Sequence, residues 1–115
     1  MEFGLSVERQ EINGSQILRL DGRIDASTCV VLEKEIQELL TRKPVLLALD
    51  FFKVDYLSSA GMRVLLSSAK KIKTLEGKFV LFGIHEDVMD IIKMAGFEKI
   101  LKICTNEREA LAALH

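Results

Sequence analysis

The chain has 115 residues, a length typical of one domain, with 49% hydrophobic and 29% charged residues. This composition argues against disorder, and a chain of this size buries enough surface to fold without metal ions or disulfides. The formal net charge of −1 gives no overall attraction to nucleic acid or to an anionic membrane. We therefore expect a single domain that meets its partner through a local patch.

The N-terminal sequence MEFGLSVERQ lacks a basic region followed by an apolar run, so it does not look like a signal peptide. The longest unbroken apolar run, Val45 to Leu49, is far shorter than the ~20 residues that a membrane-spanning helix needs. Cys29 and Cys104 form no CxxC unit and lie in or beside apolar segments, which favours two buried, reduced thiols over a disulfide. These features predict a cytoplasmic protein.

Alternating residues near the N-terminus predict a half-buried strand, with Phe3 and Leu5 on one face. The dipeptide Asn13-Gly14 is a strong turn signal because both residues tolerate positive φ. Residues 16–20 are expected to form the returning strand of a hairpin. The polar segment over residues 21–25 is expected to break that strand.

Four amphipathic helices are predicted from apolar residues at helical spacing. Asp25 or Ser27 is placed to cap the first helix by accepting a backbone N–H. Gly77 and Gly96 are expected to end the second and third helices, Gly77 in a left-handed conformation. The helices are expected over residues 26–41, 60–75 and 86–94, and around Ala110, Leu111 and Leu114.

Further strands alternate with these helices. Residues 45–49 are apolar on both faces, as in a strand at the centre of a covered sheet, and Phe51 and Phe52 are assigned to the loop that follows. Short strands are expected over residues 78–82 and 100–103. The order β-β-α-β-α-β-α-β-α predicts an α/β fold, with a mixed, mostly parallel sheet of about five strands and four helices.

Most catalytic signatures are absent from the sequence. There is no GxGxxG or Walker A loop and no Cys/His cluster with metal-ligand spacing, so no cofactor or metal is expected. His85 and His115 are isolated from each other and from a nucleophile. Ser59 precedes a helix, but the nucleophile elbow G-x-S-x-G requires glycine at the position of Leu57. The sequence therefore favours a binding protein over a hydrolase or a nucleotide-dependent enzyme.

Ser58 and Ser59 stand where the second helix begins, and serine is a favoured capping residue. Capping alone is one interpretation of both side chains. The other is regulation, because a helix N-terminus has unpaired N–H groups and partial positive charge that favour an added phosphoryl group. Arg63, one turn further on, would offset part of the phosphate charge.

The stretch LDFFKVDYLSSAGMRVLL, from Leu49 to Leu66, resembles the signature of the STAS domain, and most closely that of bacterial anti-sigma factor antagonists. The segment Gly22 to Asp25 resembles the family's G-x-hydrophobic-D motif. Ala95-Gly96-Phe97 resembles its hydrophobic-Gly-hydrophobic motif. The resemblance spans nearly the whole chain and implies one STAS domain over residues 1–115.

In that family, the serine before the small-residue/Gly pair is phosphorylated by an anti-sigma factor that is also a serine kinase. The resemblance implies phosphorylation of Ser59, with Ser58 as second choice, since this chain has Ser58 where members often carry Asp. It implies a partner-binding surface formed by Asp25, Ser58, Ser59 and Arg63. The unphosphorylated domain would bind the kinase and so release a sigma factor, and a phosphatase would remove the phosphoryl group.

Two alternatives stay open. A STAS domain can be a subunit of a stress-signalling complex or of a lipid-transport ATPase, where it binds a partner without this phosphorylation cycle. Asp25 can instead be a helix cap, and Asp55 and Arg63 solvated charges. In either case the expected state is a cytoplasmic monomer that binds neither nucleic acid nor membrane.

Overall fold

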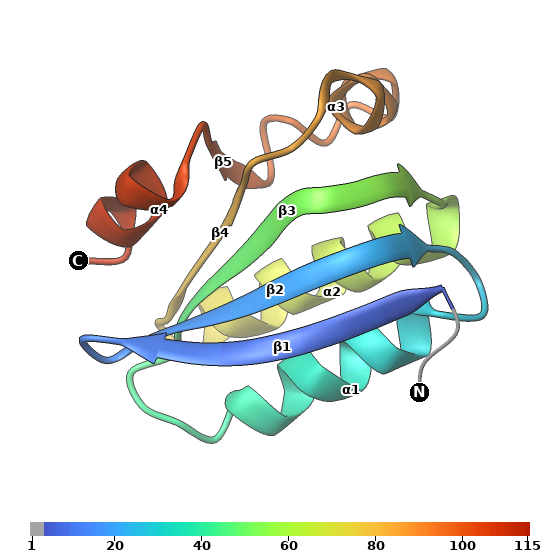
Figure 1. Cartoon of the computed structure of the whole chain (residues 1–115). Coiled ribbons are helices and arrows are strands. Elements are labelled where there is room, and N and C mark those ends of the chain that lie inside the picture. Colours follow the sequence, from blue (N-terminus) through green and yellow to red (C-terminus); the bar gives the residue numbers. More distant parts are fainter. Residues whose placement is uncertain (1–3) are drawn as a thin grey trace.

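The computed structural model describes residues 4–115 as a five-stranded sheet with four helices. The strands lie in the order β1-β2-β3-β4-β5, with β1 antiparallel to β2 and the other neighbouring pairs parallel (Figure 1). The predicted fold and element order are confirmed, although β5 begins two residues later than predicted. The elements are β1 Leu5–Ile12, β2 Ser15–Ile24, α1 Cys29–Leu39, β3 Leu46–Leu57, α2 Ser59–Thr74, β4 Lys78–Phe82, α3 Glu86–Met94, β5 Lys102–Cys104 and α4 Glu107–Ala113.

The hairpin of β1 and β2 forms one edge of the sheet. Asn13 and Gly14 make its two-residue turn with φ angles of 51° and 86°, and Ile12 pairs with Ser15 across it. These positive φ angles are the ones that the tightest hairpin turns require. The predicted turn is confirmed, whereas Phe3, predicted to lie in the first strand, is outside the described residues.

The end of β2 differs from the prediction. The expected break over residues 21–25 is wrong, because β2 continues to Ile24. Its register against β3 shifts on either side of the Asp21-Gly22 pair, so the strand bends without ending. Gly22 has a φ of 125°, and a Cβ there would lie 2.0 Å from the carbonyl oxygen of Gly4. Glycine therefore allows the two strands of the hairpin to approach at this bend.

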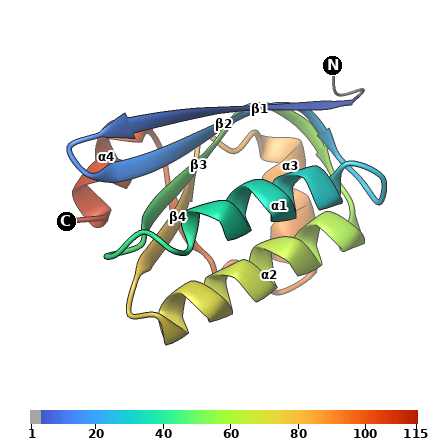
Figure 2. The same ribbon diagram turned by 90° about the horizontal axis from the view of Figure 1, so that it is seen from below.

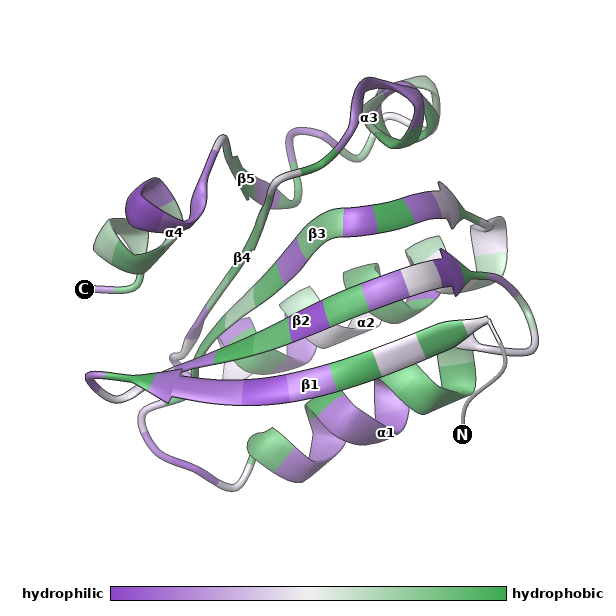
Figure 3. Cartoon of the chain, in the orientation of Figure 1, coloured by the Kyte–Doolittle hydropathy of each residue, from purple (hydrophilic) through white to green (hydrophobic). Residues whose placement is uncertain are grey.

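Strand β3 is also longer than predicted. Residues 50–57 continue the strand beyond the apolar run, because they stay paired with β2 as far as Leu57 after the pairing with β4 has ended. Phe51 and Phe52, assigned to a loop from sequence, lie within it; Phe51 is fully buried and Phe52 is 65% exposed. Figure 3 shows hydrophobic residues interspersed with hydrophilic ones along this half of β3, where the buried residues Phe51, Val54 and Leu57 are separated by exposed ones.

The sheet separates two hydrophobic cores. The larger lies against α1, α2 and α3, and Figure 2 shows α1 and α2 side by side on this face. The smaller lies beneath α4 on the opposite face. Its buried members are Ile17, Ala48, Val80, Phe82, Ala110 and Leu114. Because side chains alternate along a strand, adjacent residues such as Ile17 and Leu18 belong to different cores.

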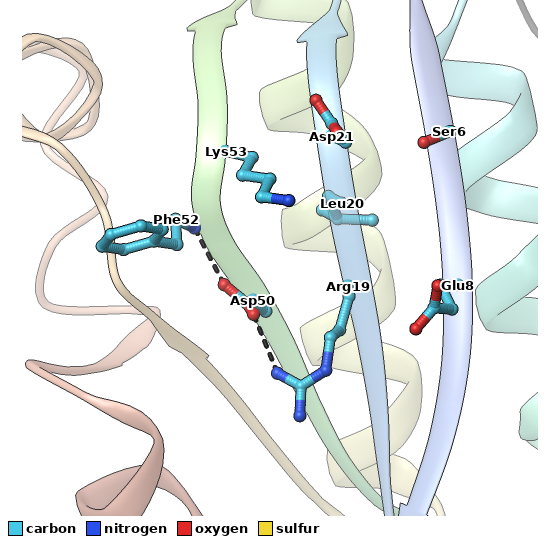
Figure 4. Close-up of a pocket in the computed structure, with 8 residues that line it drawn as sticks. All are labelled: Ser6, Glu8, Arg19, Leu20, Asp21, Asp50, Phe52 and Lys53. Carbon is cyan, nitrogen blue, oxygen red and sulfur yellow. Dashed lines mark hydrogen bonds and ion pairs between the residues drawn. The ribbon is translucent and has the colours of Figure 1, made fainter.

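Helix α4 covers only part of its face of the sheet. Beyond it, polar residues of β1, β2 and β3 line a shallow depression in which Arg19 and Asp50 point toward each other (Figure 4). Arg19 Nη1 lies 2.9 Å from Asp50 Oδ2 and 2.8 Å from Glu107 Oε1 of α4. Hydrogen bonds to Glu107 and then Asp50 raise the pKa of Arg19 above its ordinary value. This ion-pair network connects α4 to the centre of the sheet.

The start of α1 and the conformation of Gly77 after α2 differ from the prediction, each for a local reason, and α1 also ends at Leu39 instead of residue 41. Helix α1 begins at Cys29 instead of residue 26, because a hydrogen-bonded turn precedes it. After α2 the left-handed residue is Glu76, with φ of 59°, and Gly77 is not in that conformation. Glycine is needed at 77 for space, since a Cβ would lie 2.5 Å from the carbonyl oxygen of Val45. Gly96, with φ of 78°, follows α3 as predicted.

Both cysteines are free thiols; Cys29 is buried and Cys104 is half-buried. The prediction of a buried thiol is confirmed for Cys29 and wrong for Cys104, which is half-buried. Within residues 4–115, no helix combines the length and the apolar character needed to cross a membrane.

Candidate functional site

The start of α2 is built around Ser58. Its backbone is extended, with φ of −86° and ψ of 172°, and its Oγ accepts a hydrogen bond from the backbone N–H of Gly61 at 3.1 Å. Its carbonyl oxygen accepts the first helical hydrogen bond, from the N–H of Met62 at 2.9 Å. Ser58 is therefore the N-cap of α2, and its hydroxyl is engaged in holding the first turn.

Ser59, the first residue of α2, is exposed. The Ser58 hydroxyl accepts a hydrogen bond, whereas the Ser59 hydroxyl forms none with any residue from 4 to 115. The neighbouring backbone N–H groups at this helix end are not all used by the cap, which leaves a favourable environment for negative charge. The Ser59 hydroxyl is thus accessible to another protein, and the capping role belongs to Ser58.

Close packing fixes the position of this helix end on the sheet. The N–H of Ser58 donates to the carbonyl oxygen of Ile24 at 2.8 Å. A Cβ at Gly61 would lie 2.6 Å from Ile24 Cγ2 and 2.8 Å from Leu57 Cδ1. Glycine at 61 therefore lets the first turn of α2 rest directly on the ends of β2 and β3.

Asp25 organises the neighbouring turn between β2 and α1. Its Oδ1 accepts hydrogen bonds from the N–H groups of Ser27 and Thr28, each at 3.0 Å, and from the Ser27 hydroxyl at 2.8 Å. The hydrogen bond from the Ser27 side chain, followed by that from the Thr28 backbone, lowers the pKa of Asp25 below its ordinary value. The N-cap of α1 is Thr28, so the prediction of a cap at Asp25 or Ser27 is wrong. Asp25 instead accepts hydrogen bonds within the turn that precedes the helix.

A groove between α2 and α3 begins at the two serines. Its volume is about 310 Å³, and its lining is predominantly apolar. The side chain of Met62 is 4% exposed and belongs to the larger core, yet it still contributes to the groove. The residues that line it are Ser58, Ser59, Met62, Arg63, Leu66, Ile91, Ala95 and Phe97.

The structure brings three of the four predicted contact residues together. Ser58, Ser59 and Arg63 line the groove, with Arg63 exposed at its edge. Asp25 does not line it; the Ile24 carbonyl next to it is bonded to Ser58. Asp55 faces a separate depression beside His85 at the start of α3.

The α3 wall of the groove was not predicted as part of a site. Ile91 follows the apolar period of α3, and Phe97 belongs to the Ala95-Gly96-Phe97 motif. Both signals were present in the sequence, but the contact of α3 with α2 depends on tertiary packing. Sequence periodicity alone does not show which helices share a groove.

The side chains around this site include no metal-ligand cluster among the described residues. Within residues 4–115, no three His, Cys, Asp or Glu side chains gather as metal ligands. His85 Nε2 is hydrogen-bonded to the carbonyl oxygen of Phe52, and its ring lies 5.6 Å from the Phe52 ring. Arg23 lies over the Tyr56 ring at 4.3 Å from the ring centroid, a cation–π contact. The groove itself offers an apolar surface, two hydroxyls and one guanidinium.

Residues 6–110 match the family described as "STAS domain". A Bordetella bronchiseptica protein named as the anti-sigma factor antagonist BtrV is 31% identical over 109 residues, covering 95% of this chain and 93% of that protein. The crystal structure of an anti-sigma factor antagonist from Mycobacterium paratuberculosis is similar with a TM-score of 0.86 at 23% identity, covering 96% of this chain and 93% of that one. The Bacillus cell fate determinant SpoIIAA in its phosphorylated form gives a TM-score of 0.71 at 14% identity, covering 96% and 100%. These structural similarities show a common fold.

Proposed function

This chain belongs to the STAS domain family of anti-sigma factor antagonists, and from that premise we propose that it is a cytoplasmic antagonist controlled by phosphorylation of Ser59. When unphosphorylated, it binds an anti-sigma factor that is also a serine kinase, and that anti-sigma factor then releases its sigma factor. In this scheme the chain is a binding partner, and the kinase provides the catalysis.

The observation that carries the proposal is the different environment of the two serines. The Ser58 hydroxyl caps α2, whereas Ser59 is exposed at the mouth of an apolar groove. Phosphorylating Ser58 would remove a cap bond, while phosphorylating Ser59 leaves that bond in place. This contrast supports Ser59 as the modified residue.

The covalent cycle involves one bond at Ser59. The kinase transfers the γ-phosphoryl group of ATP to the Ser59 oxygen; the hydroxyl proton leaves and ADP is the other product. A phosphatase then uses water to hydrolyse the phosphoester and release inorganic phosphate. SpoIIAA, which shares the fold, has a structure in its phosphorylated form.

Phosphorylation is expected to act on binding more than on folding. The phosphoryl group adds about −1.5 to −2 charges at neutral pH, at a surface that loses its water when a partner docks. Burying an unpaired charge or opposing a like charge at an interface costs about 2–5 kcal/mol. Since ~1.4 kcal/mol is a tenfold change in affinity, one phosphoryl group is sufficient to dissociate the complex.

The remaining contact residues differ in their proposed roles. Arg63 lines the groove beside Ser59 and is proposed to contact the partner directly. Asp25 is proposed to contact it from the adjoining turn, whose rigidity comes from the hydrogen bonds to Ser27 and Thr28. Ser58 is proposed to act at the rim of the same surface while it caps the helix.

The test uses the anti-sigma factor kinases of the source organism, each purified and mixed with the full chain and ATP. Intact-mass analysis and peptide mapping are expected to find one phosphoryl group on Ser59, and none in Ser59→Ala. Ser59→Asp is expected to bind the kinase at least tenfold more weakly than Ser59→Ala does.

Three results would contradict the proposal. They are a phosphoryl group on Ser58 alone, equal binding by Ser59→Asp and wild type, or binding to a lipid-transport ATPase with no binding to a kinase.

A further inference from the structure

We infer that the partner meets the outer face of α2 with an acidic surface, so that Arg63 and Lys70 select the partner by charge. This inference rests on the proposed function, because it specifies the partner of the same site. It adds a chemical requirement on that partner, and it extends the contact surface to Lys70, about three helical turns beyond Ser59.

All the charged side chains of α2 are positive. Over residues 59–74 the helix carries four cations, Arg63, Lys70, Lys71 and Lys73, and no Asp or Glu. The chain as a whole has 16 cations and 17 anions, so the rest of it has a net charge of −5. In the described part of the chain, Arg9, Arg19, Arg23 and Arg42 form ion pairs, whereas the four cations of α2 form none. The positive charge of α2 is therefore available to another molecule.

Two grooves flank this helix and share its outer ridge. The groove toward α3 is the apolar one described above; a second groove, toward α1, is lined by Val64, Ser67 and Lys70 among others. Arg63 and Leu66 line both grooves. Figure 2 shows α2 running along the outside of this face beside α1. A single partner surface that straddles the ridge would cover Leu66 and meet Arg63 and Lys70 together.

The spacing of the two cations suits two carboxylates on one partner. Arg63 and Lys70 are seven residues apart, which is about 10 Å along a helix and two turns on the same side. Glu33 of α1 is the one carboxylate in the lining of the second groove, so one of the two positive charges there is not compensated. An acidic surface with apolar residues between its carboxylates is complementary to this ridge.

The direction in which phosphorylation changes the affinity also favours an acidic partner. A partner that presents negative groups near Ser59 is repelled by phosphorylation, whereas a basic surface would bind phosphoserine more tightly. An acidic partner is attracted by the unmodified α2 and repelled when a dianion appears at its N-terminal end. An acidic partner therefore fits both the charge of α2 and release on phosphorylation.

The experiment measures association rates of the full chain with the purified kinase that binds it, by stopped-flow. At low salt (about 50 mM), Lys70→Glu is expected to slow association roughly tenfold, with the difference shrinking at about 500 mM salt. Arg63→Glu is expected to act in the same direction. The matched control is Arg108→Glu on α4, an exposed residue on the opposite face, which makes the same change in net charge.

Several results would overturn the inference. They are an unchanged or faster rate for Lys70→Glu, an equal loss for Arg108→Glu, or wild-type binding to duplex DNA or to phosphatidylserine vesicles that Lys70→Glu abolishes. If the wild-type chain binds none of the kinases, the proposed function fails and this inference fails with it. If wild type binds but the charge reversals have no effect, only the inference fails.

Discussion

The backbone N–H of Ser58 donates to the carbonyl oxygen of Ile24 across 2.8 Å, and this bond joins the start of α2 to the end of β2. It places the exposed Ser59 next to the turn that Asp25 organises. The bond belongs to the backbone, so side-chain changes at either residue leave it possible. The junction therefore provides a fixed frame for a side chain that is to be modified.

Gly61→Ala is predicted to destabilise the protein. The new Cβ would lie 2.6 Å from Ile24 Cγ2 and 2.8 Å from Leu57 Cδ1, and such overpacking lowers the free energy of unfolding by about 1–3 kcal/mol. In an unobstructed helix, alanine is instead more stable than glycine by about 1 kcal/mol, so the sign of the effect is diagnostic. Urea unfolding of both proteins measures it. A gain in stability would show that α2 is not held against the sheet at this residue.

Ser58→Ala and Ser59→Ala are predicted to separate stability from signalling. Loss of the Ser58 cap lowers the free energy of unfolding by about 1 kcal/mol, because the N–H of Gly61 loses its acceptor. Ser59→Ala is expected to change it by less than about 0.5 kcal/mol, as for an ordinary surface substitution. Urea unfolding of the two variants is the measurement, and each serves as the control for the other. Equal losses would mean that both hydroxyls support the helix.

Asp25→Asn is predicted to reduce stability at neutral pH and to have no effect in strong acid. Hydrogen bonds from Ser27 and Thr28 lower the pKa of Asp25 below its ordinary value of 3.8, so folding favours the ionised form. That contribution is present above the ordinary pKa, and it is lost as the pH falls through the lowered pKa of the folded state. The stability difference between the two proteins is therefore expected to be constant from neutral pH to about pH 5 and to shrink below it.

Urea unfolding at a series of pH values measures this difference. The control is Asp90→Asn, the same isosteric change at an exposed residue of α3. A difference that grows as the pH falls would contradict the assignment.

Leu114→Ala is predicted to loosen α4 selectively. Leu114 is fully buried in the small core beneath α4, and removing such a side chain costs about 2–5 kcal/mol. Because this core is separate from the one under α2, amides of α4 and β5 should exchange faster, while those of α2 keep their relative protection. Hydrogen exchange followed by mass spectrometry gives the readout. Uniform acceleration over the whole chain would show that the two cores open together.

The sequence was most informative where local signals and tertiary structure agree. Residues 78–82 and 86–94 became β4 and α3 with the predicted bounds, since apolar periodicity and flanking glycines marked both ends. The turn at Asn13-Gly14 formed because no competing contact affects it. The position of Ser58 and Ser59 at the start of a helix could be predicted because a helix start is recognisable from a few residues.

Long-range pairing accounts for most of the errors. The sequence predicts a loop at Phe51 and Phe52, yet pairing with β2 as far as Leu57 keeps residues 50–57 in β3. The sequence predicts a left-handed cap at Gly77, whereas glycine is needed there to make room for the carbonyl oxygen of Val45. The groove beside Ser59 needs Ile91 and Phe97 from α3, and no local pattern shows that α3 will pack there.

The division of the interior by the sheet has a consequence for genetics. Substitutions beneath α4 would act through the lifetime and abundance of the protein, whereas substitutions of exposed residues on α2, such as Arg63 and Lys70, would act through the choice of partner. A screen for lost signalling should therefore yield two classes of alleles. Overexpression would rescue those of the first class and fail to rescue those of the second.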